Sequence, residues 1–175
     1  MIEVEVKARI DSFKEMEEKL EELGAVKSKT EFQEDIYFAS PIVDFGKTDE
    51  ALRVRTTDND IFITYKGPKL NSEAKTRKEV EMSIESAEKA KDIFLEIGFK
   101  EARTVRKNRQ YYTYENFEIS LDNVEGLPPY MEIEIGLDDN NDYSDAQNEI
   151  FKLFEKLGIT DGFERTSYME LLENL

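Results

Sequence analysis

The first segment of the chain alternates so strictly that it can form only one kind of local structure. Residues 2–10 (IEVEVKARI) place apolar side chains at even positions and charged ones at odd positions, which is typical of a half-buried β-strand. The apolar spacing then changes to three or four residues, Ser12 and Glu15 form a capping box, and Gly24 supplies a terminator. The sequence therefore predicts a strand that passes directly into an amphipathic helix.

This pattern of Glu-x-Glu strand and capped helix occurs twice more. It recurs over residues 79–98, where Ser86 opens the helix, and over residues 132–158, where Ser144 opens it. In the first of these helices we expect the stripe of Ala90, Ile93, Phe94 and Ile97 to face inward. Three such units predict a sheet with helices packed on its apolar side.

The stretches between these units also follow strand patterns. Residues 51–57 and 61–66 predict one hairpin, residues 104–114 and 117–123 predict another, and residues 32–38 predict a further strand. Loops are expected at 67–72, 126–129 and 138–142, and a short terminal helix begins at the capping box Ser167-x-x-Glu170. No linker or low-complexity stretch divides the chain, so we expect one compact domain over residues 1–175.

The composition excludes several kinds of chemistry and several kinds of partner. The chain has no cysteine and no histidine, which removes disulfides, thiol nucleophiles, soft-ligand zinc sites and imidazole-based triads. Its formal net charge of -16 opposes nonspecific binding to nucleic acid. No apolar run approaches the roughly 20 residues of a membrane span, so we expect no membrane contact and a cytoplasmic location.

Charged side chains gather on one face of the predicted strands. Side chains two residues apart in a strand point to the same side, and the opposite face of these strands is almost wholly apolar. The charged face carries Glu3, Glu5, Lys7, Arg53, Arg55, Lys66, Arg77, Glu79, Glu81, Lys107, Arg109, Asp122, Glu132 and Glu134.

Two interpretations of this charged face are open. It can be the solvated side of an ordinary antiparallel sheet, or the lining of a tunnel if the twisted sheet closes. The apolar helix stripes must cover the other face from outside, and the charged face is rich in arginine and paired carboxylates, which favours the tunnel. We therefore predict an α+β fold, an eight-stranded antiparallel closed β-barrel with three or four helices packed outside.

Seven cations and seven carboxylates leave such a tunnel nearly neutral. One or two divalent metal ions bound by the carboxylates would make it positive by roughly 2 to 4 charges, which matches a triphosphate of about -4. Glutamate pairs favour Mg²⁺ or Mn²⁺, and arginine forks match phosphate oxygens. The residues thus predict a site for a metal-bound triphosphate.

The charged positions also form an ordered series of motifs. They are Glu3-x-Glu5-x-Lys7, the stretch 44–55 (DFGKTDEALRVR), 64–68 (TYKGP), 77–81 (RKEVE), Arg106-Lys107-x-Arg109, 120–127 (SLDNVEGL), 132–135 (EIEI) and 167–172 (SYMELL). This series, along nearly the whole chain, resembles the CYTH group of triphosphate tunnel metalloenzymes, and most of all the class IV adenylyl cyclases among them.

The resemblance implies a triphosphate tunnel and a role for each matching position. The metal-side candidates are Glu3, Glu5, Glu81, Asp122, Glu132 and Glu134, for Mg²⁺ or Mn²⁺. The substrate-binding candidates are Lys7, Arg53, Arg55, Lys66, Arg77, Lys107 and Arg109, and of these Lys7, Arg53, Arg55 and Lys66 are also the catalytic candidates. The segment 167–172 is expected to be a packing helix, and a homodimer is compatible with the resemblance.

Three functions remain in competition at this point. A cyclase would convert ATP to cyclic AMP and pyrophosphate, and we expect this activity first. An inorganic or thiamine triphosphatase would hydrolyse tripolyphosphate or thiamine triphosphate instead. A noncatalytic nucleotide or polyphosphate sensor would bind without turnover, although its carboxylates would then gain nothing beside phosphate unless a metal intervened.

Overall fold

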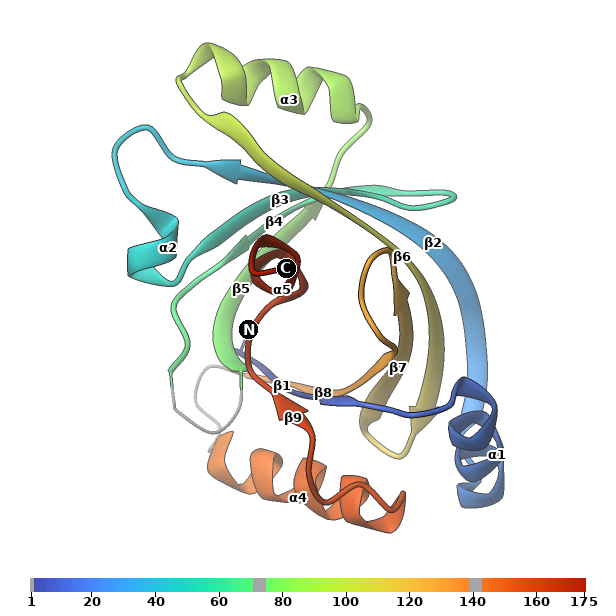
Figure 1. Cartoon of the computed structure of the whole chain (residues 1–175). Helices are drawn as coiled ribbons and strands as arrows, with labels where there is room; N and C mark the ends of the chain where they lie inside the picture. Colours follow the sequence, from blue (N-terminus) through green and yellow to red (C-terminus); the bar gives the residue numbers. More distant parts are fainter. Residues whose placement is uncertain (1, 71–74, 139–142) are drawn as a thin grey trace.

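The computed structural model of the chain describes residues 2–70, 75–138 and 143–175 (Figure 1). The strands are β1 (Ile2–Arg9), β2 (Val26–Ala39), β3 (Ala51–Thr56), β4 (Ile61–Lys66), β5 (Lys75–Ser83), β6 (Lys100–Tyr114), β7 (Phe117–Val124), β8 (Tyr130–Leu137) and β9 (Phe163–Glu164). The helices are α1 (Phe13–Leu23), α2 (Phe45–Thr48), α3 (Ala87–Glu96), α4 (Tyr143–Lys156) and α5 (Tyr168–Glu173).

Eight strands close into an antiparallel barrel, as the sequence predicts. They follow the order β5-β4-β3-β2-β6-β7-β8-β1, and the pairing of β1 with β5 completes the ring. At this closure Glu3 lies opposite Arg77, while on the other edge of β1 Glu5 lies opposite Glu134. The short strand β9 adds to β1 beyond β5, opposite Lys7 and Ala8. The predicted α+β barrel is therefore confirmed, with one strand more than expected.

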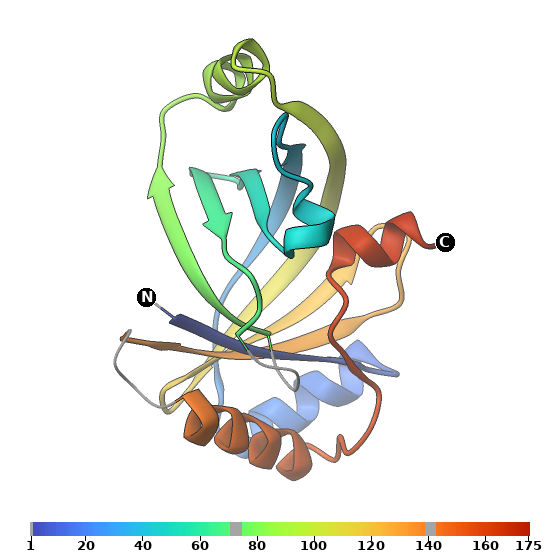
Figure 2. The same cartoon turned by 90° about the vertical axis from the view of Figure 1, so that its left-hand side faces the viewer.

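The apolar outer face of the barrel is covered unevenly. Helices α1 and α4 pack against one side, where Leu20 and Ile150 join Val4 and Ile133 in a core with no exposed surface (Figure 2). Helix α3 covers β2 and β3 through Ala90 and Phe94. In Figure 1, which looks into the barrel, α5 lies across one opening. None of the helices in the described residues is long and apolar enough to cross a membrane.

Three of the four helix starts that were predicted at a serine cap form as expected. The hydroxyl oxygens of Ser12, Ser86 and Ser167 accept hydrogen bonds from backbone N–H groups three residues on, at 3.2–3.3 Å. Gly24 ends α1 in the left-handed conformation at φ +93°, where glycine is favoured. The fourth prediction is wrong, because α4 begins at Tyr143 and Ser144 therefore lies within its first turn.

Several other predictions need correction. Strand β2 begins at Val26 instead of residue 32, because its first half is polar and mostly exposed and so lacks an apolar alternation. Ile93 and Ile97 point into solvent, with 60% and 62% exposure, because the stripe that packs on the barrel is narrower than expected. Helix α2 was not predicted. The expected loops at 71–72 and 139–142 lie outside the described residues.

Candidate active site

The barrel encloses a cavity of about 700 Å³. Except for Lys7 and Asp122, every site residue predicted from the sequence lines this cavity, and the two exceptions are buried and both contact Tyr168. The charged residues therefore face inward, as the tunnel interpretation predicts, because the inward and outward positions alternate along each strand.

Three glutamates from two neighbouring strands form an acidic cluster. One carboxylate oxygen from each of Glu3, Glu5 and Glu134 lies within 4.8 Å of the other two. Burial raises the pKa of Glu134 well above its usual range, and the negative charges of Glu3 and Glu5 raise it further. Three oxygen donors that repel one another when ionised are a suitable ligand set for a hard divalent cation.

Lys66 lies beside this acidic cluster. Its ammonium donates to Glu3 at 3.3 Å and lies 3.6 Å from Glu79. Burial alone would lower the pKa of Lys66, but the attraction of Glu3 and Glu79 outweighs it and raises the pKa. Lys66 therefore stays charged at neutral pH, between the carboxylates and the rest of the cavity.

Arg53 contrasts with the other buried arginines because, among the described residues, no carboxylate lies within hydrogen-bonding distance of its guanidinium. It is 7% exposed, its nearest ion pair is Glu81 at 4.0 Å, and its Nε has no hydrogen-bond partner among the described residues. Burial opposes its charge, yet the pKa of Arg53 is raised, chiefly through Asp35. A buried guanidinium with an unused donor in a cavity is suited to bind an anion.

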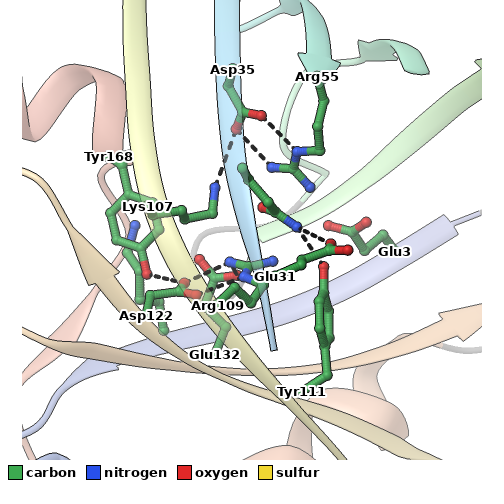
Figure 3. A network of polar contacts seen from close by, with 12 residues as sticks. Glu3, Glu31, Asp35, Arg55, Lys107, Arg109, Tyr111, Asp122, Glu132 and Tyr168 are labelled. Atoms are coloured by element: carbon green, nitrogen blue, oxygen red, sulfur yellow. Dashed lines mark hydrogen bonds and ion pairs between the residues drawn. The ribbon is translucent and has the colours of Figure 1, made fainter. Parts of the chain in front are cut away.

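Three further cations of the cavity, Arg55, Lys107 and Arg109, are held by buried carboxylates (Figure 3). Arg109 donates two hydrogen bonds of 2.6 Å to Asp122 and one of 2.8 Å to Glu132. Arg55 donates two of 2.6 and 2.7 Å to Asp35, which also accepts from Lys107 at 3.2 Å. These pairs fix the direction of each cation within the tunnel.

Asp35 was missed by the sequence analysis. It is fully buried on β2, where Gln33, Asp35 and Tyr37 continue the inward face, so the alternation of residues 32–38 could have pointed to it. Although burial would raise the pKa of Asp35, Arg55 and Lys107 hold it well below its usual range. Asp35 is therefore an anion that lies between the cations Arg55 and Lys107.

Lys107 has an unusual ionisation. Burial lowers its pKa to about 7, because the charges of Arg55 and Arg109 offset part of the attraction to Asp35. Its charge therefore depends on pH near neutrality.

The six predicted metal-side acids lie in two groups. Glu3, Glu5 and Glu134 form the acidic cluster. The other three contact side-chain donors: Glu81 accepts from Thr64 at 2.8 Å, while Asp122 and Glu132 both accept from Arg109. Metal binding by each of the six stays a prediction, and the geometry favours the first three.

Arg77 lies at the edge of the cavity. Its guanidinium donates to the carboxylate of Asp49 at 3.3 Å and to the backbone carbonyls of Asp49 and Gly67 at 3.4 Å. Asp49 ends α2 in the left-handed conformation and also accepts from Lys69. Arg77 thereby holds two loops together at the mouth of the tunnel.

A second cavity of about 550 Å³ adjoins the tunnel. Its walls are mainly apolar and include Phe38, Val43, Leu52 and Ala102, and it shares a further set of residues with the tunnel cavity. The shared residues are Tyr37, Phe45, Gly46, Glu50, Ala51, Met169 and Glu173. The ionic tunnel and an apolar chamber thus meet at a mouth formed by α2 and α5.

An antiparallel barrel with cations and carboxylates opposed in its lumen defines the class of tunnel protein to which this chain belongs. The CYTH domain model matches residues 1–168, and the chain is therefore a member of the CYTH family. This family acts on triphosphate substrates, generally with a divalent metal.

Individual relatives agree with this assignment. The chain is 45% identical over 172 residues, 98% of either protein, to a Methanocaldococcus jannaschii protein named "Putative adenylate cyclase". It is similar to the solved structure of the PH1819 protein from Pyrococcus horikoshii, with a TM-score of 0.91, 40% identity and 98% coverage of each chain. The Hippeastrum protein HpAC1, described with a dominant triphosphatase activity, shares the fold at 20% identity, with a TM-score of 0.70 and coverage of 98% of this chain and 95% of that one.

Proposed function

We propose that this protein is a divalent-metal-dependent enzyme that binds ATP in its tunnel and converts it to cyclic AMP and pyrophosphate. The observation that carries the proposal is the position of the acidic cluster and the cations in one closed lumen. A triphosphate needs both, because its negative charge must be neutralised by metal and cationic side chains in a site from which water is largely excluded.

The acidic cluster fits Mg²⁺ or Mn²⁺. Glu3, Glu5 and Glu134 offer hard oxygen donors from a rigid sheet, and their mutual repulsion would be relieved by a cation. When bound there, the metal would offset phosphate charge. The metal is an expectation from these donors and from the family.

The residues of the chain would supply positioning and charge stabilisation. In the cyclase reaction the ribose 3'-oxygen forms a bond to the α-phosphorus, the bond from that phosphorus to the bridging oxygen breaks, and the hydroxyl proton leaves to solvent or a carboxylate. Arg53 and Lys66 would bind phosphate oxygens and stabilise the charge on the departing pyrophosphate. This chemistry requires no histidine or cysteine, and the chain has neither.

The apolar chamber beside the tunnel supports a nucleoside triphosphate over bare tripolyphosphate. Its volume of about 550 Å³ lies within the range of roughly 300–1,000 Å³ that small-molecule sites have. Phe45 and Met169 stand where the chamber meets the tunnel, so an organic group attached to the triphosphate could lie against apolar walls. The name of the Methanocaldococcus relative also supports a cyclase.

Hydrolysis is the second candidate, and the activity described for HpAC1 favours it. Water would attack the terminal phosphorus and phosphate would leave, with a glutamate as general base. A sensor is the third candidate, and it would use the same cations without turnover. The cytoplasmic location and a homodimer stay predictions.

One experiment separates these candidates. The purified protein is incubated with ATP, tripolyphosphate or thiamine triphosphate, with Mg²⁺ or Mn²⁺, and cyclic AMP is resolved from phosphate. Cyclic AMP from ATP is expected, and the Arg53→Ala variant should lose it while Arg106→Ala, at an exposed surface ion pair, retains it. Phosphate without cyclic AMP would replace the cyclase by a hydrolase, and binding without product would indicate a sensor.

A further inference from the structure

Tyr168 lies inside the tunnel wall although the helix it opens lies across the mouth. It is the first residue of α5, directly after the cap Ser167, and it is 7% exposed. Its position is fixed from β1, because β9 pairs with Lys7 and Ala8 just before the chain turns into α5. The segment that leads into α5 is thereby attached to the strand that carries Glu3 and Glu5 of the acidic cluster.

The ring of Tyr168 faces two of the predicted phosphate-binding lysines. The ammonium of Lys7 lies 4.2 Å from the ring centroid and that of Lys107 lies 5.6 Å from it. Both distances are within the range of cation–π attraction, which strengthens when the cation is removed from water. Lys7 also donates to the backbone carbonyl of Thr166 at 2.5 Å. Both lysines are nearly fully buried.

An aromatic ring is better suited than a carboxylate to orient lysines for binding phosphate. Lys107 already donates to Asp35, and a further carboxylate at the place of the ring would cancel more of the positive charge that a phosphate needs. The quadrupole of the ring attracts the ammonium groups and adds no negative charge. The ring therefore orients Lys7 and Lys107 without adding negative charge, and Lys107, which also donates to Asp35, becomes fully charged when a bound anion raises its pKa from about 7.

The hydroxyl of Tyr168 acts on a third cation indirectly. It donates to Asp122 Oδ2 at 2.6 Å, and both oxygens of Asp122 accept from Arg109 (Figure 3). Burial raises the pKa of Tyr168 well above its usual range, so the hydroxyl remains a donor at neutral pH. The hydrogen bond limits the rotation of Asp122 and with it the direction of Arg109.

We infer that Tyr168 is a positioning residue of the tunnel, whose ring orients Lys7 and Lys107 and whose hydroxyl fixes the Asp122–Arg109 pair for binding a triphosphate. The inference rests on the proposed function to the extent that the ligand is a triphosphate. It does not depend on whether the reaction is cyclisation, hydrolysis or binding alone. It also makes α5 part of the site, where the sequence analysis expected only a packing helix.

The test measures binding of metal-free tripolyphosphate by calorimetry in the full chain. Tyr168→Leu removes ring and hydroxyl, and its affinity should fall about tenfold. Tyr168→Phe keeps the ring, so its affinity should lie between those of Tyr168→Leu and the wild type. The matched control is Tyr112→Phe, a buried tyrosine on β6 that packs in the outer core, and it should bind like the wild type.

Folding is checked separately by the melting temperature of each variant. A purely structural role would lower the melting temperature and leave the affinity of the folded protein unchanged, and that result would overturn the inference. If Tyr168→Leu does not fold, Tyr168→Phe should bind about threefold more weakly than Tyr112→Phe, and equal affinities would contradict the inference.

The outcome is distinguishable from failure of the proposed function. Weaker binding by the Tyr168 variants together with no turnover by the wild type would contradict the proposed enzymatic activity and support the positioning role of Tyr168. Cyclic AMP formation with equal binding by the wild type and both variants would support the enzymatic activity and contradict the positioning role. A wild type that binds no metal-free tripolyphosphate would overturn the positioning role, and the assay with ATP and metal would still decide the proposed function.

Discussion

Asp35 and Arg55 lie directly opposite each other on β2 and β3, and two hydrogen bonds of 2.6 and 2.7 Å join them inside the barrel. Lys107 donates to the same carboxylate. One buried anion thus offsets part of the charge of two cations that would otherwise repel each other inside the barrel. Its removal should affect stability and ligand binding in opposite directions.

Asp35→Asn should destabilise the protein and increase its response to ligand. Loss of one partner from a buried ion pair costs about 3–5 kcal/mol. A triphosphate can then replace the missing negative charge, so the rise in melting temperature on addition of tripolyphosphate should exceed that of the wild type. Glu34→Gln, at an exposed ion pair on the same strand, is the control and should change neither quantity. A smaller ligand response in Asp35→Asn would contradict this account.

Arg53→Met should weaken tripolyphosphate binding by about 10- to 100-fold, the equivalent of one or two charge-assisted hydrogen bonds. Because no carboxylate of the described residues hydrogen-bonds to Arg53, the melting temperature of Arg53→Met should fall less than that of Asp35→Asn. Calorimetry and thermal unfolding measure the two effects. Arg106→Met should retain wild-type affinity, and wild-type affinity in Arg53→Met would show that Arg53 is not a phosphate ligand.

Glu134→Gln should abolish the stabilisation that Mn²⁺ gives to the wild type, because it removes one of three clustered donors. In metal-free protein the same change should raise the melting temperature at pH 7, since it removes a buried charge near Glu3 and Glu5. Thermal unfolding with and without MnCl₂ checks both statements. Glu125→Gln, on an exposed turn, should behave like the wild type.

The raised pKa of Glu134 should also affect how the stability of the metal-free protein depends on pH. The folded-state pKa of Glu134 is raised, so the folded protein holds this proton more tightly than the unfolded chain does. The stability should therefore fall as the pH rises from 4.5 toward neutrality, and this fall should be smaller in Glu134→Gln. Denaturant unfolding at several pH values measures it, and identical profiles would contradict the assigned shift.

Lys107 should take up a proton when a triphosphate binds. Its pKa is about 7 in the free protein, so at pH 8 most of it is neutral, and nearby phosphate charge will raise that pKa. Calorimetry in buffers of different ionisation heat gives the number of protons exchanged. The wild type should take up nearly one proton more than Lys107→Arg, whose side chain is always charged. No difference between them would mean that Lys107 is charged before binding.

Local patterns were enough to predict much of this fold. The strict alternation of residues 2–10 and the caps Ser12, Ser86 and Ser167 depend on a few neighbouring residues, and all of them are confirmed. The polar first half of β2 gave no such signal, because neither face of it is buried.

The sequence does not show which inward-facing acid joins the acidic cluster and which pairs with an arginine, because this depends on the register between strands. Asp122 and Glu134 look alike in the sequence, each an acid on the inward face of a strand. Asp122 lies opposite Tyr130 and accepts from Arg109, whereas Glu134 lies opposite Glu5 and joins the acidic cluster. Tyr168 gave no signal either, since a tyrosine at the start of a short helix is usually a packing residue.

The pairing partners of β1 have a consequence for biosynthesis. This strand lies far along the chain from its neighbours β8 and β9, and Lys7 reaches a carbonyl 159 residues away. During synthesis the chain can therefore complete neither the barrel nor the acidic cluster until β8 has been made. Termination before β8 should leave the edge of β1 that pairs with β8 exposed and should leave Glu3 and Glu5 without Glu134.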